Sequence, residues 1–143
     1  MIIKSLSESD IDKVIELYGQ EFSDGWNKTQ FLSSFKGGRF LCLGAFDGEK
    51  LVGAISLTLG LDDADIESVF TRKDFRRKGV ADALVRCALD KVKELGLKKV
   101  LLEVRKTNES AKNLYFKHGF KEISVRKKYY PDGEDALILL WEI

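Results

Sequence analysis

The sequence has few of the residues that build metal sites, disulfide frameworks and rigid turns. Its 143 residues include one proline, two cysteines and one histidine. His118 alone cannot form a multi-histidine site, and no carboxylate cluster with metal-ligand spacing replaces it. Cys42 and Cys87 lie far apart within apolar patterns, so we expect two buried thiols and no disulfide. The sequence therefore predicts a protein without a bound metal.

The chain also lacks an excess of charge of one sign and a long apolar run. It carries 24 Lys and Arg against 23 Asp and Glu, which gives a formal net charge of +1. This balance provides no electrostatic footprint for nucleic acid or for an anionic membrane. No apolar run approaches the roughly 20 residues of a membrane-spanning helix, and residues 1–5 lack the layout of a signal peptide. We therefore expect a cytoplasmic protein that binds neither nucleic acid nor membrane.

The sequence does have the composition of one folded domain over residues 1–143, being 44% hydrophobic and 33% charged. Capping pairs Ser7/Asp10 and Asn27/Gln30 mark the starts of the first two helices. The order of elements predicts a mixed α/β sheet interrupted by helices. Strands are predicted at residues 2–5, 40–46, 51–59, 66–71, 100–105, 121–130 and 136–143, and helices at 7–18, 27–37, 79–95 and 108–118.

The segment Arg76-Arg77-Lys78-Gly79-Val80-Ala81 stands between a predicted strand and the longest predicted helix. The first N–H groups of a helix lack intrahelical partners and lie at the positive end of its dipole. Gly79 and Ala81 leave room for an anion, and the basic side chains add charge. The segment has neither the ending of a nucleotide-hydrolysing P-loop nor the three glycines of a dinucleotide site. It predicts a phosphate site for another cofactor, with a solvated basic helix start as the alternative.

Arg76-x-x-Gly79-x-Ala81 is similar to the Gln/Arg-x-x-Gly-x-Gly/Ala loop of the GNAT superfamily of acetyltransferases. Other segments resemble, in order and spacing, the branch of this family that acetylates the N-terminal alanine of a ribosomal protein. The resemblance extends over essentially the whole chain. The segments that carry it are Leu102-Glu103-Val104-Arg105, Asn108, Ala111, Leu114-Tyr115, Gly119-Phe120 and Arg126-Lys127-Lys128-Tyr129-Tyr130-Pro131.

This resemblance implies a partly splayed sheet of about seven strands flanked by about four helices, with acetyl-CoA as donor and coenzyme A as product. The cofactor would lie between the strand containing Val69-Phe70-Thr71 and the strand containing Leu102-Glu103-Val104. Phe70 and Thr71 stand where relatives carry smaller or apolar residues, so we expect backbone contacts there. The residues implied to bind the cofactor are Val69, Phe70, Thr71, Arg76, Arg77, Lys78, Gly79, Val80, Ala81, Asp82, Asn108 and Tyr115.

The resemblance also implies catalytic roles for Glu103 and Tyr115. An amine with a pKa of roughly 7.7–8.0 or higher is mostly protonated near neutrality, so a carboxylate base assists its attack on a thioester. Glu103 matches the family's base, although it can also serve as a cross-strand charge partner, and Glu67 and Asp65 are the reserve candidates. Tyr115 matches the residue that donates to the departing sulfur, although a core tyrosine is the alternative.

The acceptor implied by the resemblance is a protein N-terminus, with the alanine of a small-subunit ribosomal protein as the first candidate. Aromatic residues of an early loop and a late hairpin would flank its entrance. The alternatives are a small-molecule amine acceptor and a catalytically silent acyl-CoA-binding module. Phe22 and Trp26 can equally be core anchors, Asn108 can simply cap a helix, and His118 is expected to be a C-terminal helix cap. The candidate acceptor-binding residues are Phe22, Trp26, Glu67, Tyr129 and Tyr130.

Overall fold

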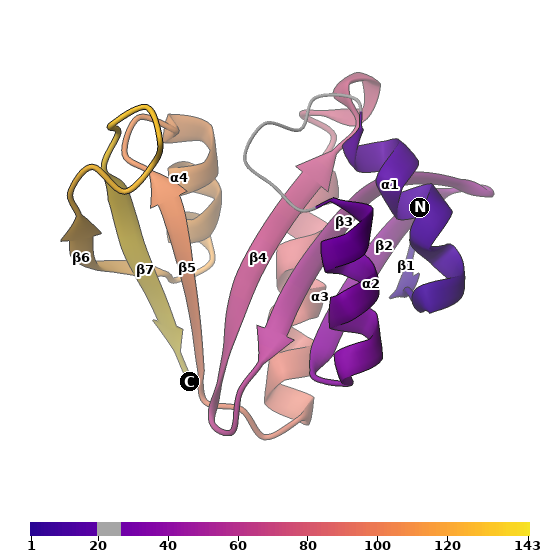
Figure 1. Ribbon diagram of the computed structural model, residues 1–143, viewed down its shortest axis with the longest axis horizontal. Coiled ribbons are helices and arrows are strands. Elements are labelled where there is room, and N and C mark those ends of the chain that lie inside the picture. Colours follow the sequence, from indigo (N-terminus) through magenta and orange to yellow (C-terminus); the bar gives the residue numbers. More distant parts are fainter. Residues whose placement is uncertain (20–26) are drawn as a thin grey trace.

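The computed structural model describes residues 1–19 and 27–143 (Figure 1). The predictions for Phe22 and Trp26 fall outside the described residues and remain predictions. Within the described part, the chain forms one seven-stranded sheet and four α-helices, which confirms the predicted mixed α/β class. No helix there is long and apolar enough to cross a membrane.

The sheet has the strand order β1-β2-β3-β4-β5-β7-β6. Every neighbouring pair is antiparallel except β4 and β5, which are parallel. The parallel pair therefore marks the position at which the two halves of the sheet meet. The strands are β1 (Ile2–Ser5), β2 (Phe40–Asp47), β3 (Lys50–Leu59), β4 (Asp63–Thr71), β5 (Lys99–Arg105), β6 (Lys121–Arg126) and β7 (Ala136–Glu142).

The four helices are α1 (Ile11–Tyr18), α2 (Lys28–Gly37), α3 (Val80–Glu94) and α4 (Glu109–Lys117). Helices α1 and α2 cover one face of the sheet, and α3 and α4 lie against the other face (Figure 1). The predicted capping pair of α2 is present: Gln30 N donates to Asn27 Oδ1 at 3.0 Å, and Asn27 N donates to Gln30 Oε1 at 2.8 Å. Reciprocal bonds of this kind satisfy backbone groups that a helix start leaves open.

Two apolar cores fix these layers. The larger core joins α3 to the sheet through fully buried side chains such as Leu84 and Val92, and it continues under β5 and β7. The smaller core joins α1 and α2 to β2 and β3 around Tyr18 and Phe31, whose rings meet edge to face at 5.1 Å. Burying one such side chain contributes about 1.5–3 kcal/mol, so each helix is held firmly on its face of the sheet.

Strands β4 and β5 separate soon after they begin. They pair only from Asp63 with Lys99 to Asp65 with Leu101, and beyond these residues the two strands diverge (Figure 1). A bulge shifts the pairing of β4 with β3 and leaves Glu67 without a cross-strand partner. The hydroxyl of Ser68, next to the bulge, bonds to Tyr18 Oη at 2.7 Å and to Ser56 Oγ at 2.5 Å. Bulges bend the strand that carries them, so β4 turns away from β5 at this point.

The structure corrects three predictions. Strand β4 begins at Asp63 instead of residue 66, because its first three residues pair with β5. Strand β6 ends at Arg126 instead of residue 130, because Lys128 has a φ of 50° and its N–H donates to the Asp135 side chain. Cys42 is buried as predicted, whereas Cys87 is only partly buried on α3.

Candidate active site

A groove of about 610 Å³ lies between the end of β4, the start of α3 and the side of α4. We call it the α3–α4 groove. It brings together eleven of the twelve residues that the sequence predicted to bind a cofactor. The exception is Lys78, whose ammonium lies 5.3 Å from the centre of the Phe75 ring. The groove is bordered by Val69, Phe70, Thr71, Phe75, Arg76, Arg77, Gly79, Val80, Ala81, Asp82, Asn108, Ser110, Ala111, Leu114 and Tyr115.

The loop that begins α3 is shaped by glycine. Gly79 is the N-cap residue and has a φ of 81°, a conformation that side chains disfavour. A Cβ atom at this position would meet no protein atom within 4 Å, so the space above the backbone is open. The α3 start has no side-chain cap, which leaves its first N–H groups available to an anion. Arg76 is held against β4 by a bond from its Nε to Thr71 O at 3.2 Å.

The groove fits an acyl-CoA in two respects. The open helix start provides N–H donors, a positive dipole end and the neighbouring Arg77 for a pyrophosphate. Because β4 and β5 separate after Asp65 and Leu101, the following backbone groups of these strands have no ladder partner from the opposing strand in the described chain. These backbone N–H and C=O groups need hydrogen-bond partners. The amides of a pantetheine arm, which have both N–H donors and C=O acceptors, can provide them.

Helix α4 supplies Asn108 and Tyr115 to this groove. Asn108 caps the helix, because its Oδ1 accepts a hydrogen bond from Ala111 N at 3.1 Å. Tyr115 is 7% exposed and its ring meets Phe120 edge to face at 5.5 Å. Burial raises the pKa of Tyr115 above its ordinary value, so the phenol keeps its proton throughout the physiological range. A protonated phenol at the base of a groove is a hydrogen-bond donor to whatever group lies there.

A second cavity, of about 260 Å³, occupies the opening between the separated strands β4 and β5. We call it the strand passage. Asn108, Ala111 and Tyr115 border both the passage and the α3–α4 groove. Glu67 and Glu103 border the passage together with a third cavity on its other side. The passage therefore shares bordering residues with both the groove and the third cavity.

This third cavity, the hairpin pocket, has a volume of about 540 Å³ and lies beside the loop between β6 and β7. Glu103 points into it from β5, opposite to the buried Val104, as strand alternation predicts. The Glu103 carboxylate lies 3.8 Å from Arg126 Nε. The same carboxylate, through a hydrogen bond and its negative charge, raises the pKa of the Tyr129 phenol. The pocket is bordered by Asp65, Ile66, Glu67, Leu101, Leu102, Glu103, Arg126, Tyr129, Tyr130 and Ile138.

The hairpin pocket is acidic. Asp65, Glu67 and Glu103 all border it, and Arg126 is the one basic residue that does so within the described part. Partial desolvation raises the pKa values of Asp65 and Glu67, and the neighbouring carboxylates add to this effect in both cases. Carboxylates whose charge is destabilised in this way favour the approach of a cation.

Sequence reasoning missed the side-chain contacts that join the helices and strands around these cavities. His118 occupies the C-cap position of α4, but its Nε2 lies 2.8 Å from Asp82 Oδ1 instead of serving the helix carbonyls. Lys117 Nζ lies 3.2 Å from the same oxygen, and these contacts lower the pKa of Asp82. The start of α3 is thus fastened to the end of α4. Arg126 belongs to a segment that carries the family resemblance, but its proximity to Glu103 depends on the pairing of β6 and β5 with β7.

The groove at the start of α3 fits an acyl-CoA, and comparisons with known proteins identify the family. The chain matches the model of the acetyltransferase (GNAT) family over residues 11–120. The protein belongs to this family and is an acetyl-CoA-dependent N-acetyltransferase.

Its similar proteins include enzymes that act on ribosomal protein bS18. The putative bS18-alanine N-acetyltransferase of Bacillus subtilis is 30% identical over 139 residues, which cover 96% of this chain and 92% of that protein. The bS18-alanine N-acetyltransferase of Escherichia coli K12 is 30% identical over 140 residues, covering 96% and 94% of the two chains. The crystal structure of the S18-alanine enzyme from Escherichia coli has a TM-score of 0.92, with 99% of this chain and 93% of that chain covered at 30% identity.

Proposed function

We propose that this enzyme transfers an acetyl group from acetyl-CoA to the N-terminal α-amine of a protein, with the N-terminal alanine of small-subunit ribosomal protein bS18 as the first candidate. The observation that carries the proposal is the strand passage, which has Tyr115 at its groove end and Glu103 at its pocket end. The names of the relatives support the choice of acceptor. We place this reaction in the cytoplasm.

In this proposal the α3–α4 groove holds the donor and the hairpin pocket holds the acceptor. Acetyl-CoA supplies an acyl group that is already activated, so no covalent bond to the protein is needed. Gly79, Arg77 and the first N–H groups of α3 bind the pyrophosphate. The loop between β6 and β7 admits a flexible peptide terminus beside Tyr129 and Tyr130.

Glu103 and Tyr115 manage the two protons at opposite ends of the strand passage. The carboxylate of Glu103 accepts a proton from the acceptor ammonium, directly or through water, and so presents an uncharged amine. The O–H of Tyr115, which burial keeps neutral before the reaction, donates a hydrogen bond to the departing sulfur. The proton that the attacking nitrogen loses as the C–S bond breaks leaves with the sulfur as the thiol of coenzyme A. Glu67 is the alternative base, since it borders the same two cavities.

The first experiment identifies the acceptor atom. Purified protein is incubated with acetyl-CoA and peptides that begin with Ala, Ser, Met or Gly and also contain an internal lysine. Fragmentation mass spectrometry then locates the acetyl group. We expect it on the N-terminal amine, with the highest kcat/KM for Ala. Acetylation of the internal lysine alone would contradict the proposal.

A second experiment separates Glu103 from Glu67 as the base. Glu103→Gln and Glu67→Gln each remove a proton acceptor and preserve side-chain volume, so each serves as the control for the other. General-base loss lowers turnover by about 10²–10⁴-fold. We expect this loss for Glu103→Gln, with unchanged affinity for acetyl-CoA. A comparable loss in Glu67→Gln alone would transfer the role to Glu67.

The acidic hairpin pocket favours one further candidate, a small polycationic amine as acceptor. Asp65, Glu67 and Glu103 are suited to an acceptor that carries a second positive charge besides the reacting amine. A spermidine competition assay distinguishes the two candidates, because an N-terminal acetyltransferase should prefer the alanine peptide. Faster turnover of spermidine than of every peptide would favour the small-amine function.

A further inference from the structure

The loop between β6 and β7 has a defined conformation built around Tyr130. Residues 127–135 form this loop, which we call the tyrosine loop, and Tyr129 and Tyr130 lie near its middle. Tyr130 N donates to Glu134 O at 3.2 Å, and Gly133 N donates to Tyr130 O at 2.8 Å. The two tyrosine rings meet edge to face at 5.1 Å. The loop thus closes on itself and presents both rings to the hairpin pocket.

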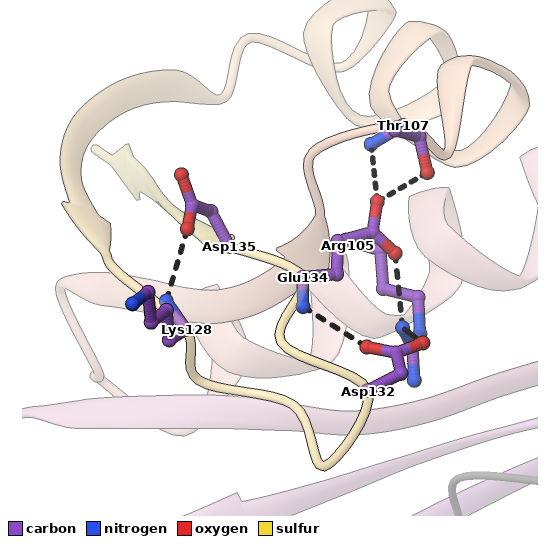
Figure 2. A network of polar contacts seen from close by, with 6 residues as sticks. All are labelled: Arg105, Thr107, Lys128, Asp132, Glu134 and Asp135. Carbon is purple, nitrogen blue, oxygen red and sulfur yellow. Dashed lines mark hydrogen bonds and ion pairs between the residues drawn. The ribbon is translucent and has the colours of Figure 1, made fainter.

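Arg105, at the end of β5, joins this loop to the sheet. Its Nη1 lies 2.8 Å from Asp132 Oδ2 and 2.9 Å from Glu134 Oε1 (Figure 2). Its guanidinium carbon lies 4.0 Å from the centre of the Tyr130 ring. The Glu134 side chain is 18% exposed, against 62% for Asp132, so the Glu134 pair is the better shielded of the two. A partly desolvated arginine pair with additional hydrogen bonds is stronger than an ordinary surface pair.

Glu134 also fastens the loop to the segment that leads into α4. Its Oε2 accepts hydrogen bonds from Thr107 N, at 3.0 Å, and from Thr107 Oγ1 (Figure 2). Thr107 directly precedes Asn108, the residue that caps α4. The contacts with Arg105 and Thr107 lower the pKa of Glu134, so the carboxylate is charged at neutral pH. One carboxylate therefore holds the tyrosine loop to both the end of β5 and the start of α4.

We propose that Arg105 and Glu134 are positioning residues for the acceptor, and that they hold the Tyr130 ring in place at the hairpin pocket before the acceptor binds. This inference rests on the proposed function. Glu134 borders none of the three cavities, so its effect passes through Arg105 and Tyr130. Ordering a binding loop in advance improves apparent affinity, because the acceptor no longer has to select a minor conformation.

We call the contacts of Glu134 with Arg105 and Thr107 the Arg105 clamp. The α3–α4 groove is stabilised by other contacts and should not depend on this clamp. Helix α4 is held to α3 by the contact between His118 and Asp82 at 2.8 Å, and it is anchored in the core by Tyr115. Loss of the Glu134 contacts should therefore release the tyrosine loop and leave the α3–α4 groove intact. The expected signature is a raised KM for the acceptor, a nearly unchanged kcat and an unchanged affinity for acetyl-CoA.

The test compares Glu134→Gln with Asp135→Asn in the full chain. Both changes neutralise a carboxylate of the same loop that accepts a backbone hydrogen bond, but the Asp135 carboxylate accepts from Lys128 N and lies 3.7 Å from Lys127 Nζ. A loop that is correctly placed only a tenth to a third of the time raises KM about three- to tenfold. We expect this rise for Glu134→Gln and no rise for Asp135→Asn, with the alanine peptide as acceptor and assays well below both melting temperatures.

The outcomes separate the clamp from the proposed function. If the unsubstituted enzyme acetylates the peptide but its KM is unchanged by Glu134→Gln, the clamp is wrong and the proposed function stands. An equal loss of acetyl-CoA affinity and of acceptor affinity would also overturn the clamp, because it would indicate general damage. If the unsubstituted enzyme acetylates no peptide, the proposed function fails and the inference fails with it.

Discussion

A matched pair of glycine substitutions tests the phosphate site at the start of α3. Gly79 stands just before this helix with a φ of 81°, and Gly96 follows its end with a φ of 76°. A Cβ at either position meets no protein atom within 4 Å, so neither alanine variant creates a clash. Each variant carries the cost of a left-handed backbone, about 1–2 kcal/mol. We therefore expect Gly79→Ala and Gly96→Ala to lower the free energy of unfolding by similar amounts.

Only the Gly79 variant should weaken cofactor binding. Gly79 borders the α3–α4 groove, where we propose that a phosphate binds the backbone N–H groups, whereas Gly96 borders a different part of the surface. Losing one charge-assisted hydrogen bond costs about 1.5–3 kcal/mol, which corresponds to a rise in Kd of at least about tenfold. Denaturant melts measure the stability and calorimetry with acetyl-CoA measures the Kd. Equal Kd values for the two variants would refute the assignment of the phosphate site.

Three further changes test other contacts. Tyr115→Phe removes the hydroxyl and preserves the ring packed on Phe120. We expect kcat to fall about 10–100-fold while the melting temperature changes little. An unaltered kcat would exclude Tyr115 as the donor to the departing sulfur. Asp82→Asn should destabilise the protein at neutral pH, because the lowered pKa of Asp82 stabilises the fold only while the carboxylate is charged. Denaturant melts should show the difference from wild type begin to shrink as the pH falls below about 4 and disappear only below the lowered pKa of Asp82. Tyr18→Phe breaks the bond to Ser68 and should cost about 1 kcal/mol of stability, seen as a melting temperature roughly 3 °C lower.

The elements of this fold could be predicted because their signals are local. The Asn27 cap, the alternation of β5 and the glycine before α3 each depend on a few neighbouring residues. The roles of Glu103 and Tyr115 and the splayed strands came from a family resemblance, because no local pattern indicates that two strands separate.

The contacts that position the site were not predictable, since they join distant residues. Arg105 and Glu134 are 29 residues apart, and Asp82 and His118 are 36 apart. Each side chain has an ordinary local interpretation as a strand end, a turn carboxylate or a helix cap. A distant contact also acts on the backbone at Lys128. Its N–H donates to the side chain of Asp135, seven residues further on, and β6 ends at Arg126 instead of the predicted residue 130.

The separation of β4 and β5 costs the sheet several backbone hydrogen bonds, and the rest of the fold shows how this is tolerated. The bulge at Glu67 accompanies the divergence, and the hydroxyls of Tyr18, Ser56 and Ser68 satisfy one another beside it. On the other side, β5 keeps its full pairing with β7 and ends in the Arg105 clamp. The two strands that border the opening, β4 and β5, are thus each stabilised by contacts of their own. The opening can therefore persist, and in the proposed function a donor in the α3–α4 groove reaches an acceptor in the hairpin pocket through it.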